Sequence, residues 1–112
     1  MPNSRLAVTP AVLAGATLLA ATLPAHAGDA RAGRQKALQC QTCHGMDGLA
    51  KIPEAPNLAG QPEDYLIKSL TDYKTGERKN EMMSVVAPPL SEADIADLAA
   101  YFASIEIEVK TP

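Results

Sequence analysis

The clearest pattern in the chain is a run of apolar residues near the C-terminus that recur at helical spacing. The members of this run are Ile95, Leu98, Ala99, Phe102 and Ile105. Ser91 precedes the run and Asp94 follows it by three residues, a pair typical of a capping box at a helix start. The pattern predicts a helix from Ser91 to about Ser104, followed by a short frayed tail that ends at Pro112.

A second helix is predicted from Asp29 to about Cys40, because most residues of this segment are good helix formers and Asp29 is suited to cap it. Gly33 lies inside the segment, where glycine costs about 1 kcal/mol relative to alanine. Gly33 is either a weak point in a surface helix or a place where another helix approaches closely. We expect the C-terminal helix to cross near Gly33, with Ala99 and Ala100 allowing the close approach.

A third helix is predicted between Pro62 and Gly76, since proline suits a first helical turn and glycine commonly follows a helix end. Its apolar residues recur at helical spacing, and they are Leu66, Leu70 and Tyr73. We expect Tyr65 and Tyr73 to lie in the core, as most aromatic residues of amphipathic helices do, with a role at a bound group as the alternative. The fold class predicted from these patterns is all-α.

The first 27 residues have the organisation of a secretory signal peptide. Arg5 precedes an apolar run from Leu6 to Leu23, and the small-residue site Ala25-His26-Ala27 follows it closely. We expect cleavage before Gly28 and export of the chain, which locates the mature protein in the periplasm. An uncleaved membrane anchor is the alternative, because the apolar run is nearly long enough to span a bilayer.

Cleavage at this point would leave residues 28–112 as a single domain of 85 residues. Domains of this size commonly need a disulfide, a metal or a cofactor for stability. The leader contains one of the ten basic residues and none of the thirteen acidic ones, so the remaining domain has a net charge of −4. This acidic balance argues against nonspecific nucleic-acid binding.

The chemistry of the chain centres on the segment Cys40-Gln41-Thr42-Cys43-His44. Two cysteines three residues apart, with a histidine directly after the second, form the pattern that attaches a c-type haem. On a short helical turn both thiols can bond one macrocycle while His44 lies beneath the iron as the proximal ligand. The pattern therefore predicts one covalent haem c attached through Cys40 and Cys43.

A Cys-x-x-Cys pair also occurs in dithiol redox centres and as half of a zinc site. Zinc would need two more good ligands, and residues 28–112 contain no other cysteine or histidine. A dithiol centre would leave His44 and the later methionines without a role. We therefore favour the haem interpretation.

Two further segments offer groups that would complete a haem site. In the loop from Leu49 to Gly60, the Pro56 carbonyl is a candidate acceptor for the second ring nitrogen of His44, while stiffening of a surface loop is the alternative role of its prolines. The distal ligand of a closed site is left to Met82 or Met83, because Met46 is tied to the proximal side and no second histidine follows position 27.

Taken together, these motifs resemble the small monohaem class I c-type cytochromes of the bacterial periplasm, whose fold is also the repeated unit of dihaem cytochromes. The resemblance covers nearly all of residues 28 to about 105. It rests on the segments Cys40–Gly45, Pro56–Gln61, Tyr65-Leu66, the methionine loop, and Pro89–Ser91 leading into Asp97–Phe102.

The resemblance implies a class I cytochrome c fold with three to four helices wrapped around one covalent haem. It implies that the Pro56 carbonyl holds His44 and that a methionine before the last helix is the distal ligand. An ungapped match of residues 78–91 places that ligand at Met83, with Met82 as the second choice. Relatives often have a further methionine where this chain has Val86.

Ligation by histidine and methionine favours an electron carrier over an enzyme, because both axial positions are filled and the iron can change valence without binding a substrate. Expected partners are periplasmic or membrane redox proteins, with no nucleic acid and no stable membrane insertion after cleavage. A basic docking patch or a solvated face is formed by Lys68, Lys74, Arg78 and Lys79. Two other functions stay open: a gas-binding or peroxide-reactive module with a labile methionine, and an electron-transfer subunit of a dehydrogenase.

Overall fold

The computed structural model describes residues 2–3, 7–13, 15–16, 21 and 26–112. Part of the predicted leader, including Arg5 and the Ala25 of its small-residue site, lies outside the described residues, so its cleavage stays a prediction. Within the described ranges, no helix is long and apolar enough to cross a membrane.

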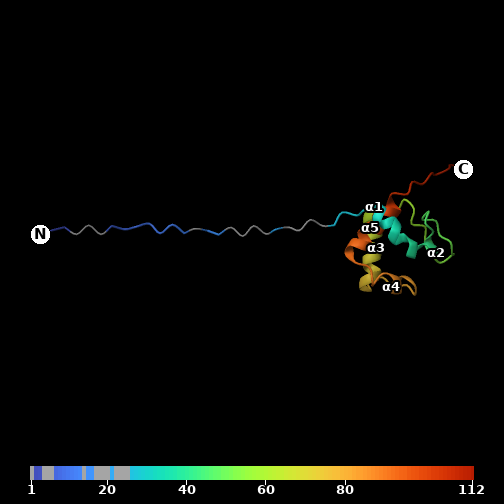
Figure 1. Cartoon of the computed structure of the whole chain (residues 1–112), viewed down its shortest axis with the longest axis horizontal. Coiled ribbons are helices and arrows are strands. Elements are labelled where there is room, and N and C mark those ends of the chain that lie inside the picture. The colour runs from blue at the N-terminus through green and yellow to red at the C-terminus, as the bar shows by residue number, and fades with distance from the viewer. Residues whose placement is uncertain (1, 4–6, 14, 17–20, 22–25) are drawn as a thin grey trace.

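The described residues form helices and loops, with no β-strand among them, which confirms the all-α prediction. The helical elements in chain order are α1 (Ala30–Lys36), the 3₁₀ turn η1 (Ala37–Gln39), α2 (Gln41–His44), α3 (Glu63–Thr75), α4 (Met83–Val86) and α5 (Glu92–Ala103). The three helices predicted from the sequence correspond to α1 with η1, α3 and α5. In Figure 1 these lie together, while α2 and α4 lie at the edges of the group.

The predicted helix ends are confirmed with one small difference. The Asp29 carboxylate accepts hydrogen bonds from the backbone N–H groups of Arg31 (2.8 Å) and Ala32 (3.3 Å). Ser91 and Asp94 form the reciprocal capping box at distances of 3.0 and 2.9 Å. Gly76 ends α3 with a φ of 84°, a conformation that glycine adopts without steric cost. Pro62 lies just before the first helical residue of α3 instead of inside its first turn.

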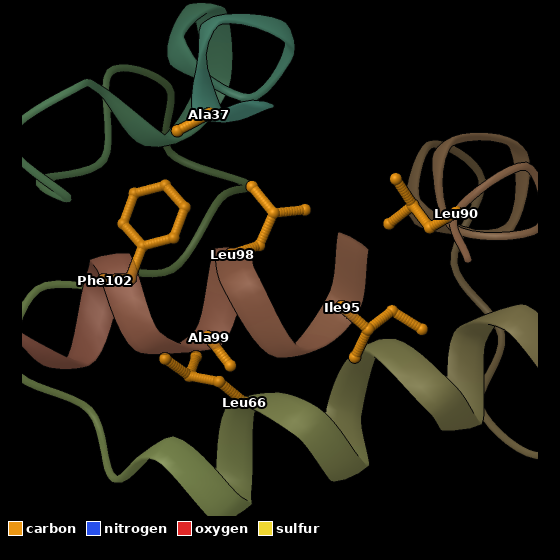
Figure 2. Packing of buried hydrophobic residues seen from close by; sticks show 7 residues of the cluster. All are labelled: Ala37, Leu66, Leu90, Ile95, Leu98, Ala99 and Phe102. Carbon is orange, nitrogen blue, oxygen red and sulfur yellow. The ribbon is translucent and has the colours of Figure 1, made fainter. Parts of the chain in front are cut away.

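The core forms around α5, which packs on both α1 and α3. Leu98 and Ala99 are each only 1% exposed, so α5 is the most deeply buried helix. In Figure 2, Leu98 and Phe102 point toward the side of Ala37, and Ala99 points toward Leu66 on α3. Burial of a leucine or phenylalanine side chain, such as Leu98 or Phe102, stabilises the fold by about 1.5–3 kcal/mol relative to exposure.

Gly33 is a point of close helix approach, as one of the two sequence interpretations predicted. A Cβ atom at this position would lie 1.9 Å from the Asp97 carbonyl oxygen and 2.8 Å from Tyr101 Cβ. The α5 residues nearest Gly33 are thus Asp97 and Tyr101, which confirms the expected crossing near Gly33. Ala100 lies against Gly28 instead, and the expectation that Ala99 allows the close approach was wrong. Residues four apart share a helix face, and Ala99 lies between them in sequence but on the core side.

The prediction that Tyr65 lies in the core is also wrong, because its side chain is 50% exposed. Tyr65 directly precedes the buried Leu66, so it points about 100° away around α3. Tyr73 is partly buried, and the Arg78 guanidinium carbon lies 4.8 Å from the centre of its ring. Residues 106–112 have no regular structure, in agreement with the predicted tail.

Candidate haem-binding site

The Cys-x-x-Cys-His segment folds as one tight helical turn. Cys40 joins η1 to α2: its N–H donates to the Ala37 carbonyl oxygen at 2.9 Å, and its own carbonyl accepts from the His44 N–H at 3.0 Å. Gly45 then ends α2 with a φ of 72°. Both thiols and the imidazole therefore lie within five consecutive residues, Cys40 and the four residues of α2.

His44 is 7% exposed, and its ring has a defined orientation. The Nδ1 atom of His44 lies 2.9 Å from the Pro56 carbonyl oxygen. Because a carbonyl can only accept, Nδ1 is the donor, and in the neutral imidazole the lone pair then lies on Nε2. This tautomer presents an unprotonated nitrogen, which is the form in which histidine binds a metal.

The loop that carries Pro56 is held by hydrogen bonds between the Pro56–Gln61 segment and the residues that follow α2, contacts that the sequence did not predict. The Gly48 carbonyl oxygen accepts from the N–H groups of Leu58 (2.7 Å) and Ala59 (3.0 Å). The Asn57 side chain accepts from the Ala50 N–H at 2.7 Å. A Cβ at Gly48 would lie 2.6 Å from the Ala59 nitrogen, so glycine is required there. The sequence signals for this arrangement were the glycines and prolines of the loop and the Pro56–Gln61 segment.

Tyr101 connects this loop to α5. Its hydroxyl donates to the Met46 carbonyl oxygen at 2.6 Å, 55 residues away in sequence. At the other end of the loop, the Gly60 N–H donates to the Phe102 carbonyl oxygen at 3.0 Å. The residues around His44 are therefore anchored at two points on the most buried helix of the protein.

The methionine segment is organised by Asn80. Its side-chain oxygen accepts from the N–H groups of Met82 (2.9 Å) and Met83 (3.0 Å) and starts the short helix α4, which the sequence pattern did not predict. The Met82 side chain is 60% exposed, whereas Met83 is partly buried. Both methionines lie on a different segment from His44, and the choice of a distal ligand stays a prediction.

Residues 30–106 match the sequence model of the family described as cytochrome c. The chain belongs to the cytochrome c family. This cytochrome c domain is 49% identical over 83 residues to cytochrome c4 of Pseudomonas aeruginosa, an alignment that covers 74% of this chain and 41% of the relative. It is 47% identical over 83 residues to cytochrome c-554(548) of Halomonas halodenitrificans, covering 71% of this chain and 100% of that protein.

A solved structure gives the same assignment. The reduced recombinant cytochrome c4 from Pseudomonas stutzeri superposes with a TM-score of 0.67 at 45% identity, over 71% of this chain and 47% of that one. Another relative is not named as a cytochrome c4 but as the thiosulfate dehydrogenase electron acceptor of Thiomonas intermedia. It is 42% identical over 97 residues, and the alignment covers 85% of this chain and 44% of that protein. The chain spans about two fifths of the length of the cytochrome c4 sequences it matches.

Membership of the cytochrome c family implies a covalently bound haem c, and the cysteines at positions 40 and 43 have the spacing for its attachment. The residues present fit this group, since both thiols are free, both are partly buried, and the adjoining imidazole offers an unprotonated nitrogen. Burial, with a smaller contribution from Cys43, raises the pKa of the free Cys40 thiol to about 11. Redox-active dithiols have lowered thiol pKa values, so this environment disfavours the dithiol alternative.

The basic residues proposed as a docking patch mostly have partners within the domain. Lys68 pairs with Asp72, one turn further along α3. The Lys74 ammonium donates to the Pro88 carbonyl oxygen at 3.0 Å and also to the Leu90 carbonyl. Lys74 therefore joins α3 to the segment between α4 and α5. The sequence did not indicate this structural role, because lysine side chains are usually exposed.

Proposed function

We propose that this protein is an exported, periplasmic electron carrier with one haem c attached at Cys40 and Cys43 and ligated by His44 and Met83. The observation that carries the proposal is the 2.9 Å contact between His44 Nδ1 and the Pro56 carbonyl oxygen, on the turn that also holds both cysteines. A histidine held in this way is oriented for a metal through its other nitrogen. Relatives in the cytochrome c4 group support an electron-transfer role.

Each residue of the proposed site has a definite task. The haem c supplies an iron that gains and loses one electron. The Pro56 carbonyl oxygen accepts a hydrogen bond from His44 Nδ1–H, which fixes the ring and makes Nε2 a stronger electron donor. The Met83 thioether is a soft ligand that favours the reduced metal and so raises the reduction potential relative to two histidines.

The fold limits how far these groups move. Gly48 and Asn57 hold the Pro56 loop, and Tyr101 ties it to α5. Asn80 holds the backbone of both methionines at the start of α4. A site built in this way changes little between two oxidation states, and small rearrangement is what rapid electron exchange with a partner requires.

Visible spectroscopy of the exported holoprotein tests this function. Acid-acetone extraction, refolding and reduction should leave the haem spectrum in place, because thioether bonds survive extraction. Carbon monoxide should leave the reduced spectrum unchanged, because both axial positions are filled. A retained haem whose spectrum shifts with carbon monoxide would favour gas binding or peroxide chemistry. Complete loss of haem on extraction would rule out attachment at Cys40 and Cys43.

A second candidate function is that of an electron acceptor dedicated to one dehydrogenase. It is favoured by the similarity to the thiosulfate dehydrogenase electron acceptor of Thiomonas intermedia. The two functions differ in the partner surface and share the haem site. Affinity purification of the exported protein from its native periplasm separates them: a stoichiometric dehydrogenase indicates the dedicated acceptor, and a free haem protein indicates the mobile carrier.

A further inference from the structure

Asp97 is an ionisable residue buried where α1 crosses α5, and the haem site does not use it. Asp97 is only 4% exposed. One carboxylate oxygen, Oδ2, accepts from the Lys36 ammonium at 2.6 Å. The other, Oδ1, accepts from the Asp29 N–H at 2.8 Å and lies 2.8 Å from His26 Nε2. A buried carboxylate needs such partners, because burial of an unpaired charge costs several kcal/mol.

Only part of this set of partners would remain in the mature protein. His26 lies before the expected cleavage point at Gly28, so removal of the leader takes this side chain away from Oδ1. Lys36 is shared with Asp94, whose Oδ1 lies 2.8 Å from the same ammonium. The two carboxylates would then share one lysine, and the other remaining partners are the Asp29 N–H for Asp97 and the Ser91 N–H for Asp94.

Cleavage also creates a new cation close to the vacated oxygen. Gly28 directly precedes Asp29, whose nitrogen already contacts Oδ1. Covalent geometry keeps consecutive backbone nitrogens within about 3.6 Å of each other. A Cβ at Gly28 would lie 2.3 Å from the Ala96 carbonyl oxygen and 2.8 Å from Ala100 Cβ, so Gly28 rests directly on α5.

We propose that the α-ammonium group of Gly28, formed when the leader is removed, replaces His26 at Asp97 Oδ1 and makes the mature N-terminus a structural part of the α1–α5 crossing. This inference rests on the export that the proposed function includes. The charged groups that surround the new amine are Asp97 and Asp94 of α5, Lys36 of α1, and Asp29, whose carboxylate is engaged in capping α1.

The replacement would place an α-amino group beside the carboxylate. Such a group has an ordinary pKa near 7.7–8.0, and a carboxylate within about 4–6 Å favours its charged form. An ammonium beside a buried carboxylate stays charged to higher pH. Cleavage would thus give Asp97 an ammonium partner at neutral pH, and the mature domain would be more stable than one in which residues in front of Gly28 move the amine away.

The test compares reduced holoproteins that differ only at this junction. One chain begins at Gly28; a second begins at position 26 and carries H26A, which moves the amine two residues away. The pKa of the labelled N-terminal amine is followed by NMR, and the melting temperature is measured over the same pH range. D97N removes the proposed partner of the amine. D94N is the matched control, because it also removes one of the two carboxylates that pair with Lys36 but leaves Asp97 in place.

We expect the Gly28 amine to have a pKa about one unit or more above its ordinary value, and to lose this shift in D97N but not in D94N. A raised pKa in the folded state gives stability that is complete below the unfolded pKa and disappears as pH rises through the folded one. The Gly28 chain should therefore melt higher than the extended chain at neutral pH, and the two should converge at about pH 10.

Equal amine pKa values and equal melting temperatures in the two chains would overturn the proposal, even if D97N fails to fold. Mass measurement of the naturally exported protein supplies a second decision, since a mature chain that begins at another residue removes the proposed amine. Neither of these results would change the haem spectrum, so they are distinguishable from a failure of the proposed electron-carrier function.

Discussion

α4 and α5 are separated by only a few residues and are built in opposite ways. α5 is twelve residues long, begins with its own capping box, and has six buried residues: Ile95, Ala96, Asp97, Leu98, Ala99 and Phe102. α4 is four residues long, has no buried residue, and has no side-chain cap at Met82, its N-cap position. Its start depends on Asn80 and its following segment on Lys74.

The difference shows how this small domain divides its tasks. Short helices are marginal in water, and most helical stability in proteins comes from packing of an apolar face. α5 has such a face and holds α1 and α3 around it. α4 is held instead by hydrogen bonds to Asn80 before it and to Lys74 after it. The segment of the proposed distal ligand is therefore supported with little apolar packing.

Removal of the Met83 thioether is expected to have the largest effect, because it opens the proposed distal position completely. Reduced M83A holoprotein should bind carbon monoxide, with a clear change in the visible spectrum. M82A, at the N-cap position that precedes Met83, is the matched control, because the Met82 side chain is more exposed and should be dispensable. Carbon monoxide binding by M82A and not by M83A would transfer the ligand assignment to Met82.

Truncation of Leu98 tests the contrasting role of α5. This side chain is 1% exposed, so L98A should lower the free energy of unfolding by about 3 kcal/mol through lost burial and a residual cavity. Val109 in the C-terminal tail is 81% exposed, and V109A should change the free energy by less than about 0.5 kcal/mol. Denaturant titration of the holoproteins measures both, and similar values would contradict a core centred on α5.

Gly33 and Gly76 give a smaller contrast between two helix glycines. G33A forces a methyl group against the Asp97 backbone, so it should destabilise the holoprotein by about 2 kcal/mol although alanine is the better helix former. G76A meets no neighbouring atom within 4 Å and should cost only the strain of a positive φ, about 1 kcal/mol. A stabilising G33A would mean that α1 does not rest directly on α5.

The smallest expected effect is on acid sensitivity at the α1–α5 crossing. Hydrogen bonds from Lys36 and from Ser91 lower the pKa of Asp94 to about 2, and Lys36, the Asp29 N–H and His26 hold the pKa of Asp97 well below its usual range. Lowered folded-state pKa values give stability that is present above the unfolded pKa, near 4, and is lost as the carboxylates protonate.

The melting temperature should therefore be nearly constant from neutral pH to about pH 5 and should fall below about pH 4. K36M brings both carboxyl pKa values closer to normal, so its acid decrease should be shallower, while its melting temperature at neutral pH should be lower. Parallel curves for K36M and the unaltered holoprotein would show that Lys36 does not contribute to acid stability.

Much of the fold could be predicted because its signals are local. The caps at Asp29 and Ser91 and the stop at Gly76 depend on residues within a few positions of each helix end. The short turn of α2 and the adjacency of its two thiols and imidazole are likewise fixed within five residues. Local geometry also explains why η1 tightens the end of the first predicted helix without changing its place in the chain.

The predictions that failed concern which face of a helix meets which neighbour. Tyr65 has a residue type typical of cores, but the direction of Leu66 leaves it at the surface. Ala99 has a side chain small enough for a crossing, yet it faces the core, and Asp97 and Tyr101 lie against Gly33. The Asn80 side chain starts α4 by accepting hydrogen bonds from two backbone N–H groups, and no periodic pattern predicted this helix.

The sequence by itself determined the class of fold, the main helices and the chemistry of the Cys-x-x-Cys-His turn, because periodicity, capping and covalent adjacency act between near neighbours in the chain. Only the tertiary structure decided that Asp97 is buried beside Lys36, that Tyr101 reaches Met46, and that Lys74 closes on Pro88. These contacts join residues far apart in sequence, and a buried or bonded partner is defined only when the helices have packed.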